Sequence, residues 1–114
     1  MTMSSHYENL RVEMRVVSKK AITEFIARYP SSASALWTWH KVVKDAAWSN
    51  LAEVRTVYPH ADSVDRCTVF NIKGNHYRLI ARVNYQYQKV YIRNILAHKE
   101  YDKGDWKDGC RTSD

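Results

Sequence analysis

Residues 66–83 read RCTVFNIKGNHYRLIARV, and this stretch decides the fold. Apolar and polar side chains alternate on both sides of Lys73-Gly74-Asn75, as in strands, whose successive side chains point to opposite faces. Gly74 can take a positive φ without steric cost, which predicts a hairpin between strands over 66–72 and 76–83. The second strand has two faces, one with Tyr77, Leu79, Ala81 and Val83, the other with His76, Arg78, Ile80 and Arg82.

The same pattern extends in both directions along the chain. Residues 84–88 predict a turn, and residues 90–96 predict a third strand, which completes a three-stranded antiparallel meander. Met14 to Val17 is a short β-prone run that can add to this sheet as an edge strand.

The residues before the meander have the apolar spacing of helices. Ser18 can cap a helix that Pro30 ends, and Ser31 or Ser32 can cap a second helix that runs to about Ala47. Each has one apolar stripe, formed by Ile22, Phe25, Ile26 and Tyr29 in the first and by Leu36, Trp39, Val43 and Ala46 in the second.

A third, shorter helix follows. Asn50 and Glu53 have the spacing of a capping box, which predicts a helix through Val57 that Pro59 stops. The predicted fold is therefore α+β, an antiparallel sheet in the order β-α-α-β-β-β with two N-terminal helices packed on one face as an antiparallel pair.

The length of 114 residues indicates one domain. We expect a flexible extension over residues 1–13, the domain over 14–103 and a polar tail over 104–114. Cys67 falls in a strand and Cys110 in the tail, which predicts one buried and one exposed thiol in a reducing compartment. No apolar run approaches the ~20 residues of a membrane span, and the start lacks the apolar block of a secretory signal, so we expect a cytoplasmic protein without a membrane partner.

Positive charge is concentrated in one segment. Residues 66–103 contain eight Lys and Arg against two acidic residues, a surplus equal to the formal charge of +6 of the whole chain. Tyrosines and asparagines lie between these cations. Such a cationic strip suits a polyanion with stackable bases, which indicates RNA.

The residue types in the chain exclude several kinds of catalytic site. Three widely spaced glycines exclude a Gly-rich phosphate loop, and the scattered histidines offer no metal site, so no cofactor or metal is expected. Cleavage of RNA without a metal needs a base, an acid and cations that stabilise the charge on the phosphorane. Arg78 could hold the phosphate, His98 could transfer protons, and Tyr101 could orient the nucleotide or share in proton transfer. The predicted RNA-binding residues are Asn71, Lys73, Asn75, Arg82, Arg93 and Lys99.

Structural interpretations compete with these assignments. Arg78 and Arg82 could lie on the solvated face of an antiparallel sheet. His98 could be a strand-end histidine bonded to a carbonyl. Trp37, Trp39 and Trp48 could stack on bases, but Trp39 falls on the core face of its helix, and the other two are better explained as packing residues or as part of a partner interface.

The strings Val69-Phe70-Asn71-Ile72-Lys73-Gly74-Asn75-His76-Tyr77-Arg78-Leu79 and His98-Lys99-Glu100-Tyr101-Asp102 resemble those of the HigB family of toxins, within the RelE superfamily. The resemblance, which spans about residues 14–103, implies a RelE-like fold and an mRNA interferase that cleaves translated mRNA on the ribosome. It also implies a cognate antitoxin, usually with a helix-turn-helix. The motif maps onto Asn71, Asn75, Tyr77, Arg78, His98 and Tyr101, with Lys73 and Lys99 as accessory cations. Tyr77 ranks below Arg78, because its strand face predicts that it points into the core.

Three hypotheses follow. The first is a ribosome-dependent, metal-independent endoribonuclease toxin that inhibits translation. The second is a non-catalytic module that blocks translation by occupying RNA or the ribosome. The third, also drawn from the resemblance, is a toxin that targets DNA gyrase; the His98 to Tyr101 motif argues against it, since gyrase poisoning needs no proton-transfer residue.

Overall fold

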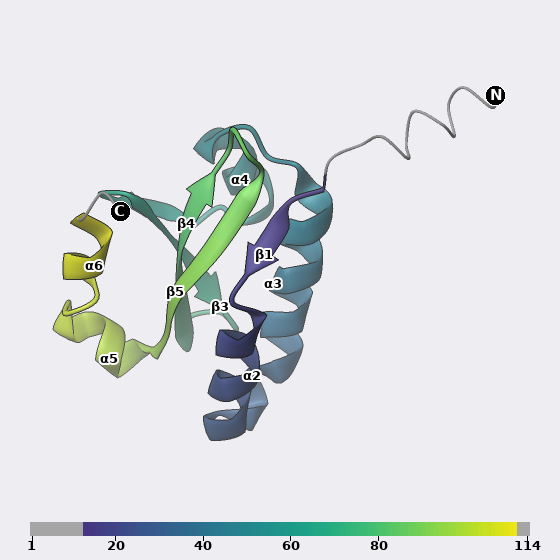
Figure 1. Cartoon of the computed structure of the whole chain (residues 1–114). Helices are drawn as coiled ribbons and strands as arrows, with labels where there is room; N and C mark the ends of the chain where they lie inside the picture. Colours follow the sequence, from purple (N-terminus) through teal and green to yellow (C-terminus); the bar gives the residue numbers. More distant parts are fainter. Residues whose placement is uncertain (1–12, 112–114) are drawn as a thin grey trace.

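A computed structural model describes residues 13–111 of the chain (Figure 1). Apart from Glu13, the predicted N-terminal extension lies outside the described residues, as do residues 112–114 of the predicted tail. The elements follow one another as β1 (Arg15–Val17), α2 (Lys19–Arg28), η1 (Pro30–Ser32), α3 (Ala33–Ala46), α4 (Leu51–Val57), β2 (Asp62–Val64), β3 (Cys67–Ile72), β4 (Tyr77–Asn84), β5 (Lys89–Ala97), α5 (His98–Lys103) and α6 (Lys107–Arg111).

One five-stranded sheet has the order β1-β5-β4-β3-β2. The predicted meander β3-β4-β5 is confirmed, and β1 is an edge strand that pairs with β5 in parallel. The strand β2, which pairs antiparallel with β3 on the other edge, was not predicted. Its three residues are mostly exposed and carry no alternating pattern.

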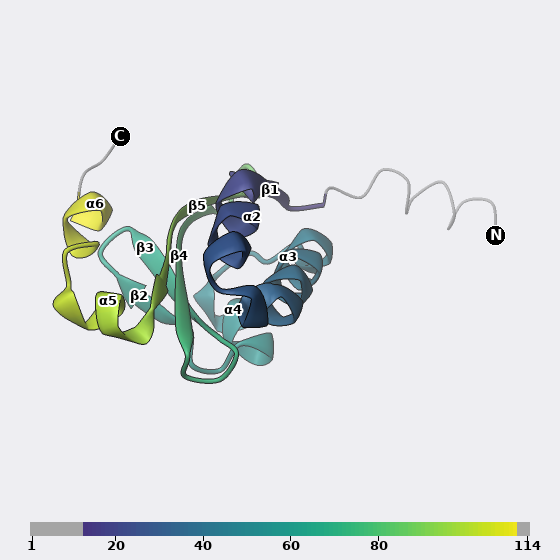
Figure 2. The same cartoon turned by 90° about the horizontal axis from the view of Figure 1, so that it is seen from below.

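Helices α2 and α3 lie side by side against one face of the sheet (Figures 1 and 2). The predicted stripes are confirmed, with Ile22 and Phe25 of α2 and Leu36, Trp39 and Val43 of α3 buried. The serines do not cap as predicted. Ser18 and Ser32 occupy the N-cap positions, but neither side chain makes a capping hydrogen bond, and the Ser32 hydroxyl instead donates to the carbonyl of Tyr29 at 2.6 Å.

The capping box of α4 is confirmed. The backbone N–H of Glu53 donates to Oδ1 of Asn50 at 3.0 Å. The Glu53 carboxylate in return accepts from the backbone N–H of Ser49 at 2.6 Å, one residue before the cap. The first bond satisfies an N–H group that the first turn of a helix leaves without an intrahelical partner, and the second satisfies the N–H of the residue before the cap.

The opposite face of the sheet is partly covered by α5 and α6, as Figure 2 shows. A second apolar cluster forms there from Cys67, Val69, Ile80, Trp106 and Cys110. The sequence predicts a polar tail over residues 104–114, but in the structure residues 107–111 of this segment form helix α6. Trp106, which is 6% exposed, and Cys110 anchor it.

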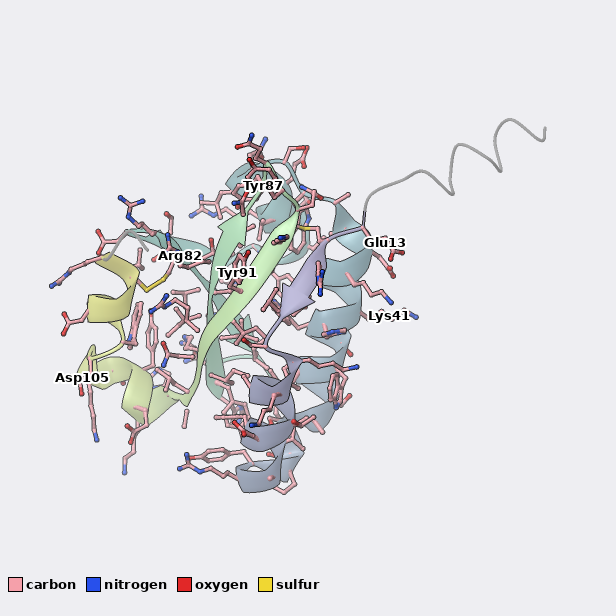
Figure 3. The ribbon with its side chains drawn as sticks, in the orientation of Figure 1. Glu13, Lys41, Arg82, Tyr87, Tyr91 and Asp105 are labelled. Carbon is pink, nitrogen blue, oxygen red and sulfur yellow. A yellow bond between two sulfur atoms is a disulfide. The ribbon has the colours of Figure 1, made fainter. Side chains whose placement is uncertain are left out.

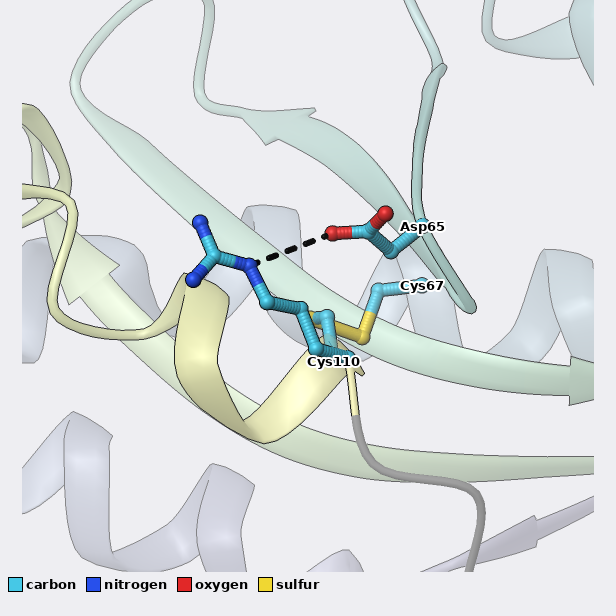
Figure 4. Close-up of a disulfide and its surroundings, with 4 residues drawn as sticks. Asp65, Cys67 and Cys110 are labelled. Carbon is cyan, nitrogen blue, oxygen red and sulfur yellow. Dashed lines mark ion pairs between the residues drawn. A yellow bond between two sulfur atoms is a disulfide. The ribbon is translucent and has the colours of Figure 1, made fainter.

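Cys67 and Cys110 form a disulfide (Figure 4). The prediction of one buried and one exposed thiol was therefore wrong, and it no longer supports a reducing compartment. Sequence spacing could not reveal the bond, because it joins residues 43 positions apart. Within residues 13–111, no helix combines the length and apolarity needed to cross a membrane. The predicted α+β class, with two helices on one face of the sheet, is confirmed, but the sheet is mixed rather than antiparallel, because β1 pairs with β5 in parallel.

Candidate functional site

Arg78 lies at the centre of the candidate site, on the sheet face that carries α5 and α6. In the register of the sheet it sits opposite Asn71 of β3 and Leu96 of β5. The residue is 8% exposed, so the alternative of a solvated arginine is wrong for Arg78. Burial of a guanidinium that never loses its charge costs free energy unless hydrogen bonds or an anion compensate it.

The hairpin loop before β4 holds this guanidinium. Nη1 of Arg78 donates to the carbonyls of Asn75 at 3.3 Å and Tyr77 at 3.2 Å, and Nη2 donates to Oδ1 of Asn75 at 2.5 Å. No ion pair joins Arg78 to a carboxylate within residues 13–111. The protein thus orients a buried cation without neutralising it, which is a suitable arrangement for binding a phosphate.

Tyr101 of α5 packs directly against Arg78. The guanidinium carbon lies 5.2 Å from the centroid of the tyrosine ring, a cation–π contact. Burial raises the pKa of the Tyr101 phenol; the Arg78 charge opposes this change, and Asp62 and Asp102 add to it. The phenol therefore keeps its proton at neutral pH and can donate it.

His98 is the first residue of α5. Its backbone N–H donates to the carbonyl of His76 at 3.1 Å, which ties the start of the helix to the beginning of β4. Its Nδ1 lies 3.1 Å from Oδ2 of Asp102, one helical turn further on. This contact fixes the orientation of the ring and leaves Nε2 as the nitrogen for proton exchange. The alternative for His98 was a side chain bonded to a carbonyl, but its ring contacts the Asp102 carboxylate instead. A ring–carbonyl contact is found at His76, whose Nδ1 lies 2.9 Å from the carbonyl oxygen of Lys73.

The two predicted asparagines lie beside a hollow at the tip of the β3–β4 hairpin. Asn71 and Asn75 line this hollow of about 570 Å³ together with Tyr58, Pro59, His60, Ala61 and Gly74. Gly74 has the predicted positive φ, 62°, and the exposed Lys73 before it has a φ of 54°. Apolar walls and two amides next to the buried Arg78 guanidinium are suitable for a nucleobase.

Arg82 and Arg93 lie elsewhere on the same face. Together with Arg66, they line a separate groove of about 750 Å³ that also includes Tyr85 and Tyr91. Arg82 and Tyr91 are labelled in Figure 3. A Cβ placed on Gly109 of α6 would lie 2.9 Å from Nη2 of Arg93, so α6 approaches this guanidinium closely. Of the predicted RNA-binding residues, Arg82 and Arg93 therefore lie apart from Asn71, Lys73 and Asn75 at the hairpin tip. The remaining one, Lys99, is exposed on α5.

Tyr77 is in the core, as predicted. It is 8% exposed and belongs to the apolar cluster beneath α2 and α3. Trp39 and Trp48 are also buried in this cluster, which confirms that they are packing residues, and the partly buried Trp37 packs against it. Within residues 13–111, no group of three His, Cys, Asp or Glu side chains is arranged to hold a metal ion.

Two residues of the site were not assigned a role from the sequence. Asp102 belongs to the quoted motif, and its spacing of four residues from His98 could have indicated the contact, since such pairs share a helix face. Trp106 stacks on Tyr101 with 4.9 Å between ring centroids and 14° between ring planes. Its only signal in the sequence was a large aromatic residue within a polar segment.

Comparison with known proteins supports the resemblance. The family model of HigB toxins, described as the RelE-like toxic component of a toxin–antitoxin system, matches residues 32–104. The chain is 32% identical to the mRNA interferase HigB of Escherichia coli O6:H1, over 79% of this chain and 90% of that protein. It is 30% identical to the mRNA interferase HigB of Shigella flexneri, over 78% of this chain and 88% of that protein.

The α+β fold and this family match define a RelE-like toxic component of a toxin–antitoxin system. The chain belongs to the HigB toxin family.

Proposed function

We propose that this toxin is an endoribonuclease that cleaves mRNA without a metal ion, and that Arg78 binds the scissile phosphate. The observation that carries the proposal is the buried Arg78 guanidinium, which contacts Tyr101 and has no carboxylate partner in residues 13–111. Its relatives are named as mRNA interferases, which supports the same substrate class.

The proposed reaction is attack by the 2′-hydroxyl on the adjacent phosphate. His98, through Nε2, accepts the hydroxyl proton, and the 2′-oxygen forms a bond to phosphorus. The bond from phosphorus to the 5′-oxygen then breaks, and the protonated phenol of Tyr101 donates a proton to that oxygen. The products are a 2′,3′-cyclic phosphate and a 5′-hydroxyl. Arg78 stabilises the negative charge that accumulates on the phosphorane.

The remaining predicted residues position the RNA. Asn71 and Asn75 contact a base in the hollow at the hairpin tip, and Lys73 and Lys99 attract the neighbouring phosphates from exposed positions. Arg82 and Arg93, in the second groove, bind a more distant part of the backbone, with tyrosine rings available for stacking.

We further propose the setting in which the toxin acts. Its substrate is mRNA on translating ribosomes in the cytoplasm, so that cleavage inhibits translation, and a helix-turn-helix antitoxin neutralises it. Residues 14–103 form the toxin domain. Two charged surfaces on one sheet face support the ribosome as a partner, since one can hold mRNA while the other contacts ribosomal RNA.

The test is the mapping of new 5′ ends by primer extension on mRNA, with purified toxin and translating ribosomes, followed by identification of the end groups as 5′-hydroxyl or 5′-phosphate. Wild-type toxin is expected to produce discrete 5′-hydroxyl ends under these conditions. R78A should abolish them, and H98A should reduce their rate by about 10²- to 10⁴-fold, the usual contribution of a proton-transfer residue.

A matched control is R28A. Arg28 is an exposed arginine of α2, on the sheet face opposite Arg78, so its loss should leave cleavage unchanged. Inhibition of translation without new 5′ ends would instead support the non-catalytic alternative, in which the toxin acts by occupancy. New ends that carry a 5′-phosphate would refute the metal-independent attack by the 2′-hydroxyl. Cleavage that proceeds equally on naked RNA would refute ribosome dependence.

A further inference from the structure

The C-terminal helix α6 follows the segment that the HigB family model matches, which ends at residue 104. It is attached to the start of β3 by three bonds. The disulfide joins Cys110 to Cys67, the backbone N–H of Arg66 donates to the carbonyl of Cys110 at 3.1 Å, and Nε of Arg111 lies 3.8 Å from Oδ2 of Asp65 (Figure 4).

Trp106, between α5 and α6, connects this attachment to the candidate site. Its indole ring stacks on Tyr101, and its Nε1 donates to the carbonyl of Tyr101 at 2.9 Å. The same carbonyl accepts from the backbone N–H of Gly104 at 3.1 Å. Tyr101 in turn contacts the Arg78 guanidinium. A continuous series of contacts therefore runs from the disulfide to the residue that would bind phosphate.

Helix α6 depends on these attachments to stay in place. It has five residues, and a helix of this length is not stable by itself in water. Its buried residue is Cys110, one partner of the disulfide. Loss of the disulfide removes the covalent link and leaves noncovalent contacts to hold the helix. These include the backbone hydrogen bond from Arg66, the packing of Trp106 in the second apolar cluster and a solvent-exposed ion pair, and exposed ion pairs contribute little.

We propose that Trp106 is a positioning residue for Tyr101 and Arg78, and that the Cys67–Cys110 disulfide makes this positioning dependent on thiol redox state. This inference rests on the proposed function of the same site. A dithiol reductant supplies two electrons and two protons, the bond between the two sulfurs breaks, both cysteines become thiols, and the dithiol closes to a cyclic disulfide. Release of α6 removes Trp106 from Tyr101 and leaves the site disordered, so the oxidised toxin is the active form.

The experiment compares oxidised toxin with toxin reduced by dithiothreitol, whose oxidised form is then removed together with the excess. Reduction should lower kcat by roughly 10- to 100-fold with little change in KM, since misplacement of a catalytic group by about an ångström has effects of this size. The double variant C67S/C110S should show the lower kcat in both conditions. Reoxidation of the wild-type protein should restore the original rate.

Trp106 is tested separately in the oxidised protein. W106A should lower kcat as reduction does, whereas W106F, which keeps an aromatic ring but loses the N–H donor, should recover part of the rate. The matched control is W48F, because Trp48 is equally buried, 4% exposed against 6%, but packs on Phe70 in the other apolar cluster. Reduction should lower the kcat of W48F by the same factor as that of the wild-type protein.

A structural readout keeps the two proposals distinguishable. The NMR signals of the Tyr101 ring and of the Arg78 guanidinium should shift on reduction and in W106A, but not in W48F. Shifts of these signals in a protein that cleaves no RNA in either state would support the redox-dependent positioning by Trp106 and the disulfide, and would contradict the proposed function. Equal kcat and unchanged signals in oxidised and reduced wild-type protein would overturn the redox inference, and full activity of oxidised W106A would overturn the role of Trp106.

Discussion

Nδ1 of His98 and Oδ2 of Asp102 lie 3.1 Å apart on successive turns of α5. The pair is largely solvent-exposed, with side-chain exposures of 44% and 60%. The value of the contact for folding is therefore small, because water screens exposed pairs. In the proposed mechanism its role is orientation, since a carboxylate that accepts from Nδ1–H leaves Nε2 as the nitrogen that accepts a proton.

The first prediction concerns this pair. D102N should lower kcat of RNA cleavage by about tenfold and leave KM unchanged, because the imidazole then samples orientations in which Nε2 does not reach the 2′-hydroxyl. The rate should be measured in single-turnover experiments. E100Q on the same helix is the control, since Glu100 pairs with Lys103 and should not affect the rate. A loss in E100Q as large as that in D102N would show that charge near α5, rather than the His98 contact, is responsible.

Replacement of Arg78 by lysine tests the geometry of the phosphate site. R78K keeps the positive charge but loses the fork of donors that Asn75 and Tyr77 hold in place. We expect a loss of about 10²- to 10³-fold in kcat, the usual cost of removing an oriented donor to a developing negative charge. Wild-type rates in R78K would mean that only the charge matters. Far-UV circular dichroism should confirm that the variant is folded.

The second groove should contribute to the salt dependence of RNA binding. Each lost phosphate contact reduces the slope of log K against log[salt] by about 0.7 for single-stranded RNA. R82A and R93A should each lower the slope by about this amount while leaving kcat at saturating RNA unchanged. Titrations at several salt concentrations measure the slope. K41A, an exposed cation on α3, should bind RNA with the wild-type slope.

The cap of α4 should have a measurable effect on stability. N50A should lower the free energy of unfolding by about 1 kcal/mol, because it removes the acceptor for the backbone N–H of Glu53. N50G should lower the free energy of unfolding by only about a few tenths of a kcal/mol. Urea denaturation of each variant gives the difference, and equal stability of N50A and the wild type would show that solvent satisfies this N–H equally well.

Alkaline pH should destabilise the fold through buried phenols. Burial raises the pKa of Tyr58 and of Tyr101 above the ordinary value of 10.0. The unfolded chain therefore releases these protons first, so the stabilisation is complete below pH 10 and is lost as pH rises through the higher pKa of the folded state. The free energy of unfolding should fall between pH 9 and 11 in urea titrations, and Y58F should fall less steeply. A slope in Y58F equal to that of the wild type would exclude Tyr58 as a cause.

The sequence was sufficient where the structure depends on local patterns. Alternation on either side of Gly74 predicted the meander and placed Arg78 and Tyr77 on opposite faces, which the burial of Tyr77 beneath the helices confirms. The apolar stripes predicted both long helices, and the spacing of Asn50 and Glu53 predicted the cap of α4. These features follow from residues within a few positions of one another.

Features that depend on distant residues were not predictable in the same way. The disulfide joins Cys67 and Cys110, which are 43 positions apart, and it places α6 back over the sheet. Strand parity placed Arg78 and Arg82 on the same face, but the structure puts Arg82 in a groove apart from the contacts of Arg78.

The parallel pairing of β1 with β5 has a consequence for synthesis of the toxin. Residues Arg15 to Val17 find their partners only when Lys89 to Tyr91 are available, so a nascent chain cannot complete its sheet until β5 has left the ribosome. Contacts between such distant segments also slow folding, because a long loop must close first. A ribosome making this protein therefore carries no finished toxin during elongation up to that point.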